Sequence, residues 1–308
     1  MAKRPYDPSP GLEDSGDIPR AGKKMEKTGS GWEQMQLLRR LLRNYFSVFG
    51  LVITLGTVLA ALLAPFLAPH SPVEIFPAPM SPPSSEFFLG TDYLGRCLLS
   101  RIIYGAQISV GVAASSVAIS LLLGIPLGLV AGYYGGAVGG AILRGMDILL
   151  SFPLVVLALG IIAMLGPSTT NLILTIGVVY TPTFVRLVNG SVLSCKENEY
   201  VLAARALGSR DLRILFSHIL PNIVAPIIVQ ASLTFSTAIL VESALSFLGM
   251  GTQPPTPSWG AMISESRTMM ELAPWTVIYP GLALSVTVIG LNLLGDGLRD
   301  TFDQFLKD

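Results

Sequence analysis

The stretch that decides the fold class is residues 108–134, ISVGVAASSVAISLLLGIPLGLVAGYY. Its 27 residues include no Asp, Glu, Lys, Arg or His. A helix needs about 20 mostly apolar residues to cross the hydrocarbon core of a bilayer. The stretch therefore predicts a membrane-spanning helix that is long enough to tilt, and Pro126 offers a position for a kink.

The rest of the 308-residue chain follows the same pattern, because only 13% of its residues are charged, against about 25% in soluble domains. Five further apolar runs predict membrane spans, namely Tyr45–Ala64, Ile148–Leu165, Asn171–Val185, Ile223–Val241 and Leu272–Gly295. The formal net charge of +0 gives no basic field for nucleic acid, and two cysteines and two histidines are too few for a clustered zinc site or a disulfide framework. We expect an all-α integral membrane protein with six transmembrane helices, located in the cell membrane.

The distribution of Lys and Arg predicts the orientation of these spans, since both residues collect on the cytoplasmic side. With both termini inside, 17 of the 20 positive residues fall in cytoplasmic segments, and only Arg96, Arg101 and Arg267 fall outside. An N-in, C-in topology follows. It places Cys97 outside and Cys195 inside, so that the two cannot pair, and it leaves two long outer loops, residues 65–100 and 249–273.

The N-terminal region divides into two segments before the six-span domain of residues 44–308. Residues 1–30 are polar, charged and rich in Pro and Gly, which predicts a disordered cytoplasmic tail. In residues 31–43 apolar side chains recur at spacings of three and four, with arginines among them, which favours an amphipathic helix lying at the inner membrane interface. The alternative is a plain cytoplasmic extension of the first span.

A charged segment, EYVLAARALGSRDLRILFSHILPN (199–222), interrupts the apolar pattern within the predicted cytoplasmic loop of residues 195–222. Its first part is rich in helix-forming residues, and Gly208 suits the end of a helix. Ser209 can cap a second helix, and Asp211 complements its dipole. Pro221 limits that second helix and leads into the fifth span. The segment therefore reads as a helix, a glycine corner and a second helix.

This segment resembles the cytoplasmic loop of ATP-binding cassette (ABC) importer permeases, whose pattern is Glu-Ala-Ala, three residues, Gly, nine residues, Ile-x-Leu-Pro. Leu202 and His218 depart from that pattern, and Glu199, about one turn earlier, could replace the missing glutamate. In the family this loop is a coupling helix that docks in a groove of an ATPase subunit. The resemblance implies an ATPase-coupling role for Glu199, Ala203, Ala204, Arg205, Gly208, Arg210, Leu220 and Pro221.

Three further stretches look like signatures of the dipeptide, oligopeptide and nickel importers: FLGTDYLGRCLLSRIIYGAQIS (88–109), ESALSFLGMGTQPPTPSWGAMI (242–263) and GDGLRD (295–300). The chain is thus similar to the C-type permease subunit of such an importer, with peptides as the expected substrate. The resemblance implies the type I importer architecture, a homologous second permease, one or two types of ATPase subunit and an external substrate-binding protein. It implies no cofactor on this chain, with ATP and Mg²⁺ held by the ATPase subunits.

The chain carries no ATP-binding loop of its own. Such a loop needs G-x-x-x-x-G-K-[ST], and the nearest stretch, around Gly22, has the wrong spacing and no hydroxyl. We therefore expect a transport subunit that is not itself an enzyme. The alternatives are a secondary transporter driven by protons or sodium, a membrane scaffold that transports nothing, and nickel or another solute as the cargo.

Charged and small residues near the spans allow more than one interpretation. Glu242, at the outer end of the fifth span, could serve a gate or a proton site, or it could reach interfacial water or pair inside a complex. Arg144 and Asp147 are three residues apart and predict a local pair. The spacings Gly124-x-x-x-Gly128 and Gly136-x-x-x-Gly140 could permit close helix contact or could be chance.

Overall fold

The computed structural model describes residues 44–305, with side chains to residue 302. The predicted tail of residues 1–30 and the predicted interfacial helix of residues 31–43 lie outside the described residues. Within them the chain is helical, apart from loops and one isolated bridge between Thr91 and Cys97.

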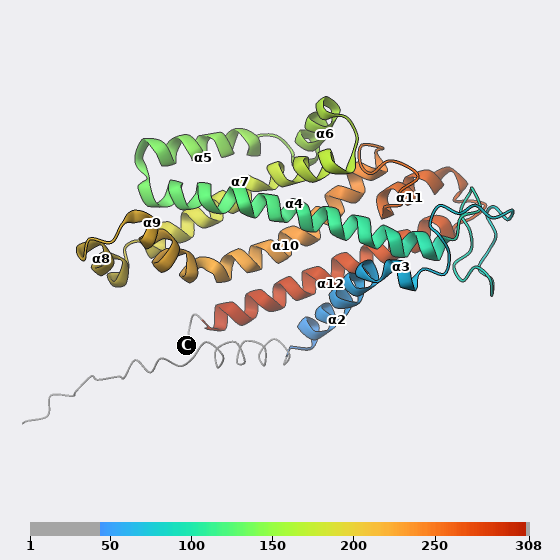
Figure 1. Cartoon of the computed structure of the whole chain (residues 1–308), viewed down its shortest axis with the longest axis horizontal. Coiled ribbons are helices and arrows are strands. Elements are labelled where there is room, and N and C mark those ends of the chain that lie inside the picture. Colours follow the sequence, from blue (N-terminus) through green and yellow to red (C-terminus); the bar gives the residue numbers. More distant parts are fainter. Residues whose placement is uncertain (1–43, 306–308) are drawn as a thin grey trace, which may run out of the picture.

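Long helices run side by side along the bundle, with their loops gathered at its two ends (Figure 1). The long helices are α2 (Tyr45–Leu62), α4 (Leu98–Tyr134), α7 (Thr169–Cys195), α10 (Leu220–Phe247) and α12 (Trp275–Phe305). Shorter helices are α3 (Ala64–Leu67), α5 (Gly136–Leu150), α6 (Leu154–Leu165), α8 (Glu199–Ala206), α9 (Asp211–Ile214) and α11 (Trp259–Ser266). In the described part of the chain, five helical segments are long and apolar enough to cross a membrane, and a bent pair could make a sixth span.

The third predicted span, Ile148–Leu165, is not one helix, which corrects the sequence prediction. It comprises the end of α5 and all of α6, which meet at an angle of 90°. Pro153 is the N-cap residue of α6, and proline disfavours helical backbone in the preceding residue, so the helix breaks here. With 12 residues, α6 is about 18 Å long, too short to cross the hydrocarbon core alone.

Small residues let α4 and α7 approach closely, and this pair makes the most extensive helix contact among the described residues. Gly124, Gly128 and Gly132 lie at successive four-residue steps along α4, and a Cβ on any of them would come within 2.7 Å of an α7 side chain. Ser120 Oγ also donates a hydrogen bond of 2.7 Å to the backbone oxygen of Gly177. The spacing Gly124-x-x-x-Gly128 is therefore a helix-packing site.

The spacing Gly136-x-x-x-Gly140 has no such role within this chain, because a Cβ on either glycine would meet nothing within 4 Å. Glycines of the GDGLRD stretch do pack closely. A Cβ on Gly297 would lie 2.0 Å from Ser47 Oγ of α2, and one on Gly295 would lie 2.9 Å from Leu233 of α10. This stretch therefore fixes α12 against both neighbours.

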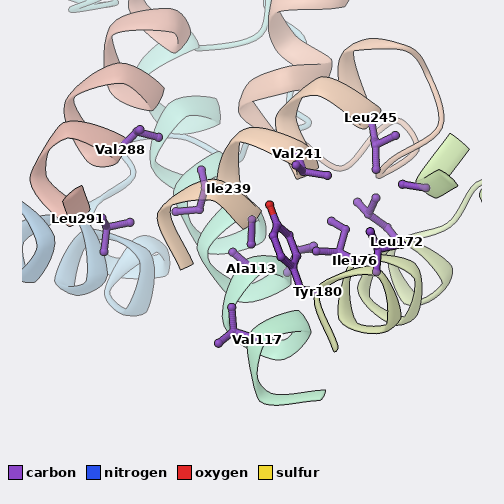
Figure 2. Packing of buried hydrophobic residues seen from close by; sticks show 14 of the residues in the cluster. Ala113, Val117, Leu172, Ile176, Tyr180, Ile239, Val241, Leu245, Val288 and Leu291 are labelled. Carbon is purple, nitrogen blue, oxygen red and sulfur yellow. The ribbon is translucent and has the colours of Figure 1, made fainter. Parts of the chain in front are cut away.

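The largest apolar core lies where α4, α7, α10 and α12 converge (Figure 2). Figure 2 shows Ala113 and Val117 of α4 facing Ile176 and Tyr180 of α7, with α10 residues beside them. A second cluster, at the α8 end of the bundle, joins Leu129, Val188, Val201 and Ile214. Cys97 and Cys195 are both free and buried.

Candidate functional site

The charged segment forms a projecting corner at one end of the bundle, with α11 at the opposite end (Figure 1). We call residues 199–214, which comprise α8, the turn at Gly208 and α9, the coupling elbow. Gly208 adopts φ +75°, a left-handed conformation that glycine tolerates best. Its N–H donates to the oxygen of Arg205 at 3.0 Å, and the Ser209 N–H donates to the oxygen of Ala204 at 3.1 Å. These two bonds close the end of α8, so the predicted helix, glycine corner and helix are confirmed.

Two local predictions for this segment are wrong. Arg210, not Ser209, is the residue that caps α9, and no side chain makes the capping bond. Pro221 does not end the second helix. It lies in the first turn of α10, where its missing N–H is not needed, and a π-helical turn at Leu215–Ile219 joins α9 to α10. As a result, residues 211–247 form one 37-residue helical segment, and the elbow continues directly into the fifth span.

The predicted site residues differ in their exposure. Glu199, Ala203, Arg205, Gly208, Arg210 and Pro221 are exposed, and Leu220 is half-buried. Ala204 is only 7% exposed and packs into the second apolar cluster. The resemblance implied the same coupling role for Ala203 and Ala204, but Ala204 is covered and supports the elbow from within.

Exposed apolar side chains on the elbow were missed by the sequence analysis. Leu207 is 87% exposed and Leu212 is 67% exposed, and both stand among the exposed arginines. Leucines at such exposure are ordinary on a lipid-facing helix, but this elbow lies beyond the predicted spans, on the side predicted to be cytoplasmic. An apolar centre with a charged rim is typical of a protein interface.

The elbow is held against the end of α4. The hydroxyl of Tyr133 donates to Asp211 Oδ1 at 2.8 Å, and the Arg205 guanidinium lies 5.5 Å from the centre of the Tyr133 ring. Lys196 Nζ donates to the backbone oxygen of Gly132 at 3.2 Å. These contacts explain why a charged segment keeps a fixed position at the end of an apolar bundle.

A cluster of four charged residues, of which Asp92, Arg96 and Arg101 are buried and Glu265 is half-buried, connects the first outer loop to α11 at the opposite end of the molecule. Arg96 Nε lies 2.6 Å from Asp92, and an amino nitrogen of Arg96 lies 2.9 Å from Glu265. Arg101 approaches the same two carboxylates at 3.4 and 3.2 Å. Burial lowers the pKa of Arg96, but the attraction of Asp92 and Glu265 outweighs burial and raises that pKa overall.

Trp259 brings two of the sequence signatures together. Trp259 Nε1 donates to the oxygen of Ile102 at 3.1 Å, and Gly105 leaves room for the indole ring, because a Cβ there would lie 3.0 Å from it. Residues 88–109 and 242–263 therefore form one structural unit at the predicted outer face. Two of the arginines that the orientation rule left outside, Arg96 and Arg101, are the buried cations of this unit.

Two predictions about charged residues in the spans are corrected. Glu242 does not reach interfacial water, since it is 0% exposed and accepts hydrogen bonds from Ser243 at 3.2 Å and Ser246 at 2.8 Å. Asp147 pairs across helices with Arg186 of α7, at 2.5 Å, rather than with Arg144 of its own helix.

Comparison with known proteins identifies the class to which this fold and site belong. Residues 124–308 match the family described as the binding-protein-dependent transport system inner membrane component. Residues 32–83 match the N-terminal transmembrane domain of oligopeptide transport permease C. The chain belongs to the family of binding-protein-dependent transport system inner membrane components.

Similar curated proteins have closely related names. The dipeptide transport system permease protein DppC of Escherichia coli is 49% identical over 272 residues, which cover 86% of this chain and 91% of that protein. The di/tripeptide transport system permease protein DppC of Pseudomonas aeruginosa is 47% identical, over 86% of this chain and 90% of that protein. DppC of Alkalihalophilus pseudofirmus is 45% identical over 279 residues, 90% of this chain and 91% of that protein.

The fold also resembles a solved structure. A chain from the inward-facing MetNI methionine ABC transporter aligns with a TM-score of 0.54 and 18% identity, over 66% of this chain and 96% of its own length. At this identity the likeness concerns the fold alone, and it confirms the type I importer architecture.

Proposed function

We propose that this chain is the C-type permease subunit of an ATP-driven importer of dipeptides and oligopeptides. The observation that carries the proposal is the identity of 45–49% to dipeptide permeases over at least 86% of the chain. The importer needs a homologous second permease, one or two types of ATPase subunit that bind ATP and Mg²⁺, and an external binding protein that delivers the peptide.

The coupling elbow supports docking of the ATPase. Ala203, Leu207 and Leu212 are exposed apolar residues of the elbow, and Arg205 and Arg210 are exposed cations of the same segment. A groove with apolar walls and acidic edges would complement this surface, and Glu199 at the start of α8 can accept hydrogen bonds from its rim. Leu220 and Pro221 lie where the elbow enters α10, so a displacement of the elbow is passed into a helix of the bundle.

The structure at the end of the molecule opposite the elbow supports contact with the binding protein. The ion pairs among Asp92, Arg96, Arg101 and Glu265 fix the first outer loop to α11. A rigid outer surface can bind a partner without the entropy cost of ordering its loops. Closure of the ATPase pair would move the elbows, tilt the helices and open the path between the two permeases to the other side of the membrane.

Affinity purification of the tagged chain from its native membrane, with identification of co-eluting proteins by mass spectrometry, tests this assembly. We expect a similar permease, ATPases with phosphate-binding loops and a peptide-binding protein. The same tagged chain should restore uptake of a radiolabelled dipeptide to a strain that lacks this permease. Recovery of the chain without any ATPase, in a strain where uptake is restored, would contradict the proposal and favour an ion-driven transporter.

A further inference from the structure

Tyr133 occupies an unusual position at the end of α4. Although it is the second-last residue of that helix, its side chain is only 9% exposed. It contacts both arms of the coupling elbow: its hydroxyl donates to Asp211 at the start of α9, and its ring lies under the guanidinium of Arg205 in the last turn of α8. One aromatic side chain of α4 therefore fixes the angle between the two arms.

Apolar packing reinforces this connection. Leu129 and Tyr133 share the second apolar cluster with Val201 of α8 and Ile214 of α9. A bond between a hydroxyl and a carboxylate is among the stronger hydrogen bonds in proteins, and a cation over an aromatic face adds to it. The elbow thus sits on the end of α4 as well as at the start of α10.

The helix that carries Tyr133 reaches the opposite end of the molecule. With 37 residues, α4 is about 55 Å long, and its contacts with α7 leave no room for a Cβ at Gly124, Gly128 or Gly132. Arg101, in the first turn of α4, is part of the charge cluster. Because α4 is one continuous helix, with Pro126 inside it, a displacement at the Tyr133 end can reach the outer loops through a single element that α7 supports along its length.

We propose that Tyr133 is the positioning residue that makes the coupling elbow and α4 move as one body. The proposal rests on the proposed function, because it needs an ATPase to displace the elbow. Without this joint, the ATPase would still turn over, but the elbow would rotate on α4 instead of carrying it, and ATP would be hydrolysed without peptide movement.

The test uses the complete importer in nanodiscs, with its binding protein and a dipeptide. Tyr133→Phe removes the bond to Asp211 and keeps the ring under Arg205. We expect the peptide transported per ATP hydrolysed to fall on the order of tenfold, with ATPase stimulation by the loaded binding protein within about twofold of the wild type. Tyr134→Phe is the matched control, because Tyr134 is 52% exposed and should leave the ratio unchanged.

A second pair of variants tests the same joint from the elbow. Asp211→Ala removes the acceptor and should reproduce the loss, whereas Asp211→Asn keeps an acceptor oxygen and should restore most of the ratio. A general defect in folding would reduce ATPase stimulation and transport together, so an unchanged stimulation separates positioning from folding.

Spin labels give a readout that does not depend on transport. With labels on α8 at Leu202 and on α4 at Leu122, both exposed, the distance should be the same in the nucleotide-free and ATP-vanadate states. In Tyr133→Phe it should differ between the two states. A wild-type distance that changes, or a Tyr133→Phe importer that couples normally, would overturn the proposal. Absence of bound ATPase in the wild type would instead contradict the proposed function.

Discussion

Gly208 gives the sharpest prediction about the coupling elbow. Its φ of +75° costs an L-residue roughly 1–2 kcal/mol of backbone strain, and a Cβ there would meet nothing within 4 Å. Substitution therefore changes the backbone energy alone in the isolated chain. At 1.4 kcal/mol per factor of ten, Gly208→Ala should reduce the equilibrium constant for forming the native corner about 5- to 30-fold. Gly208→Asn should lose less, because asparagine tolerates this conformation.

The assay is the equilibrium affinity of the permease pair for its ATPase subunits in nanodiscs, with surface expression as the check on membrane insertion. We expect insertion to be normal for Ala, Asn and Leu at this position, and the affinity to decrease in the order Gly, Asn, Ala. Because space around Gly208 is open in this chain, any loss in Gly208→Leu beyond that in Gly208→Ala measures a clash with the docked ATPase. Wild-type affinity and uptake in Gly208→Leu would refute the docking model.

Two further predictions concern stability. A Cβ at Gly128 would lie 2.6 Å from Val188 Cβ, so Gly128→Ala should lower the free energy of unfolding in nanodiscs by about 1–3 kcal/mol. In Gly111→Ala, on the same helix, the new Cβ meets open space, so the free energy of unfolding should stay at the wild-type value. Equal losses of stability in the two variants would contradict the packing argument. Glu265→Gln leaves two buried arginines short of one negative charge, which costs about 3 kcal/mol and should speed proteolysis of the outer loops. Glu271→Gln, at an exposed position six residues further along the chain, is the control, and its outer loops should be cleaved at the wild-type rate.

Membrane insertion and the elbow were predictable because each follows from local sequence. Apolar runs mark the spans, and the glycine at 208 marks the corner. The first and last residues of the helices were less predictable, because a charged residue can lie inside a helix when a buried partner neutralises its charge. The helix α4 begins at Leu98, ten residues before the predicted limit, because Arg101 is neutralised by Asp92 and Glu265.

Contacts between distant segments account for the other differences. Asp147 has a positive residue three positions away in Arg144, but packing brings Arg186 of α7 closer. Glu242 is buried by the packing of α10 against its neighbouring helices, whereas its hydrogen-bond donors Ser243 and Ser246 lie on its own helix. The continuation of the elbow into α10 required a π-helical turn, for which the sequence carries no periodic signal.

The most direct test of the account is uptake of a labelled dipeptide by proteoliposomes that contain this chain, its partner permease, the ATPases and the binding protein. We predict uptake that requires ATP inside the vesicles and the binding protein outside, and that is lost when the chain is omitted. Uptake that follows an imposed proton or sodium gradient without ATP would contradict the account.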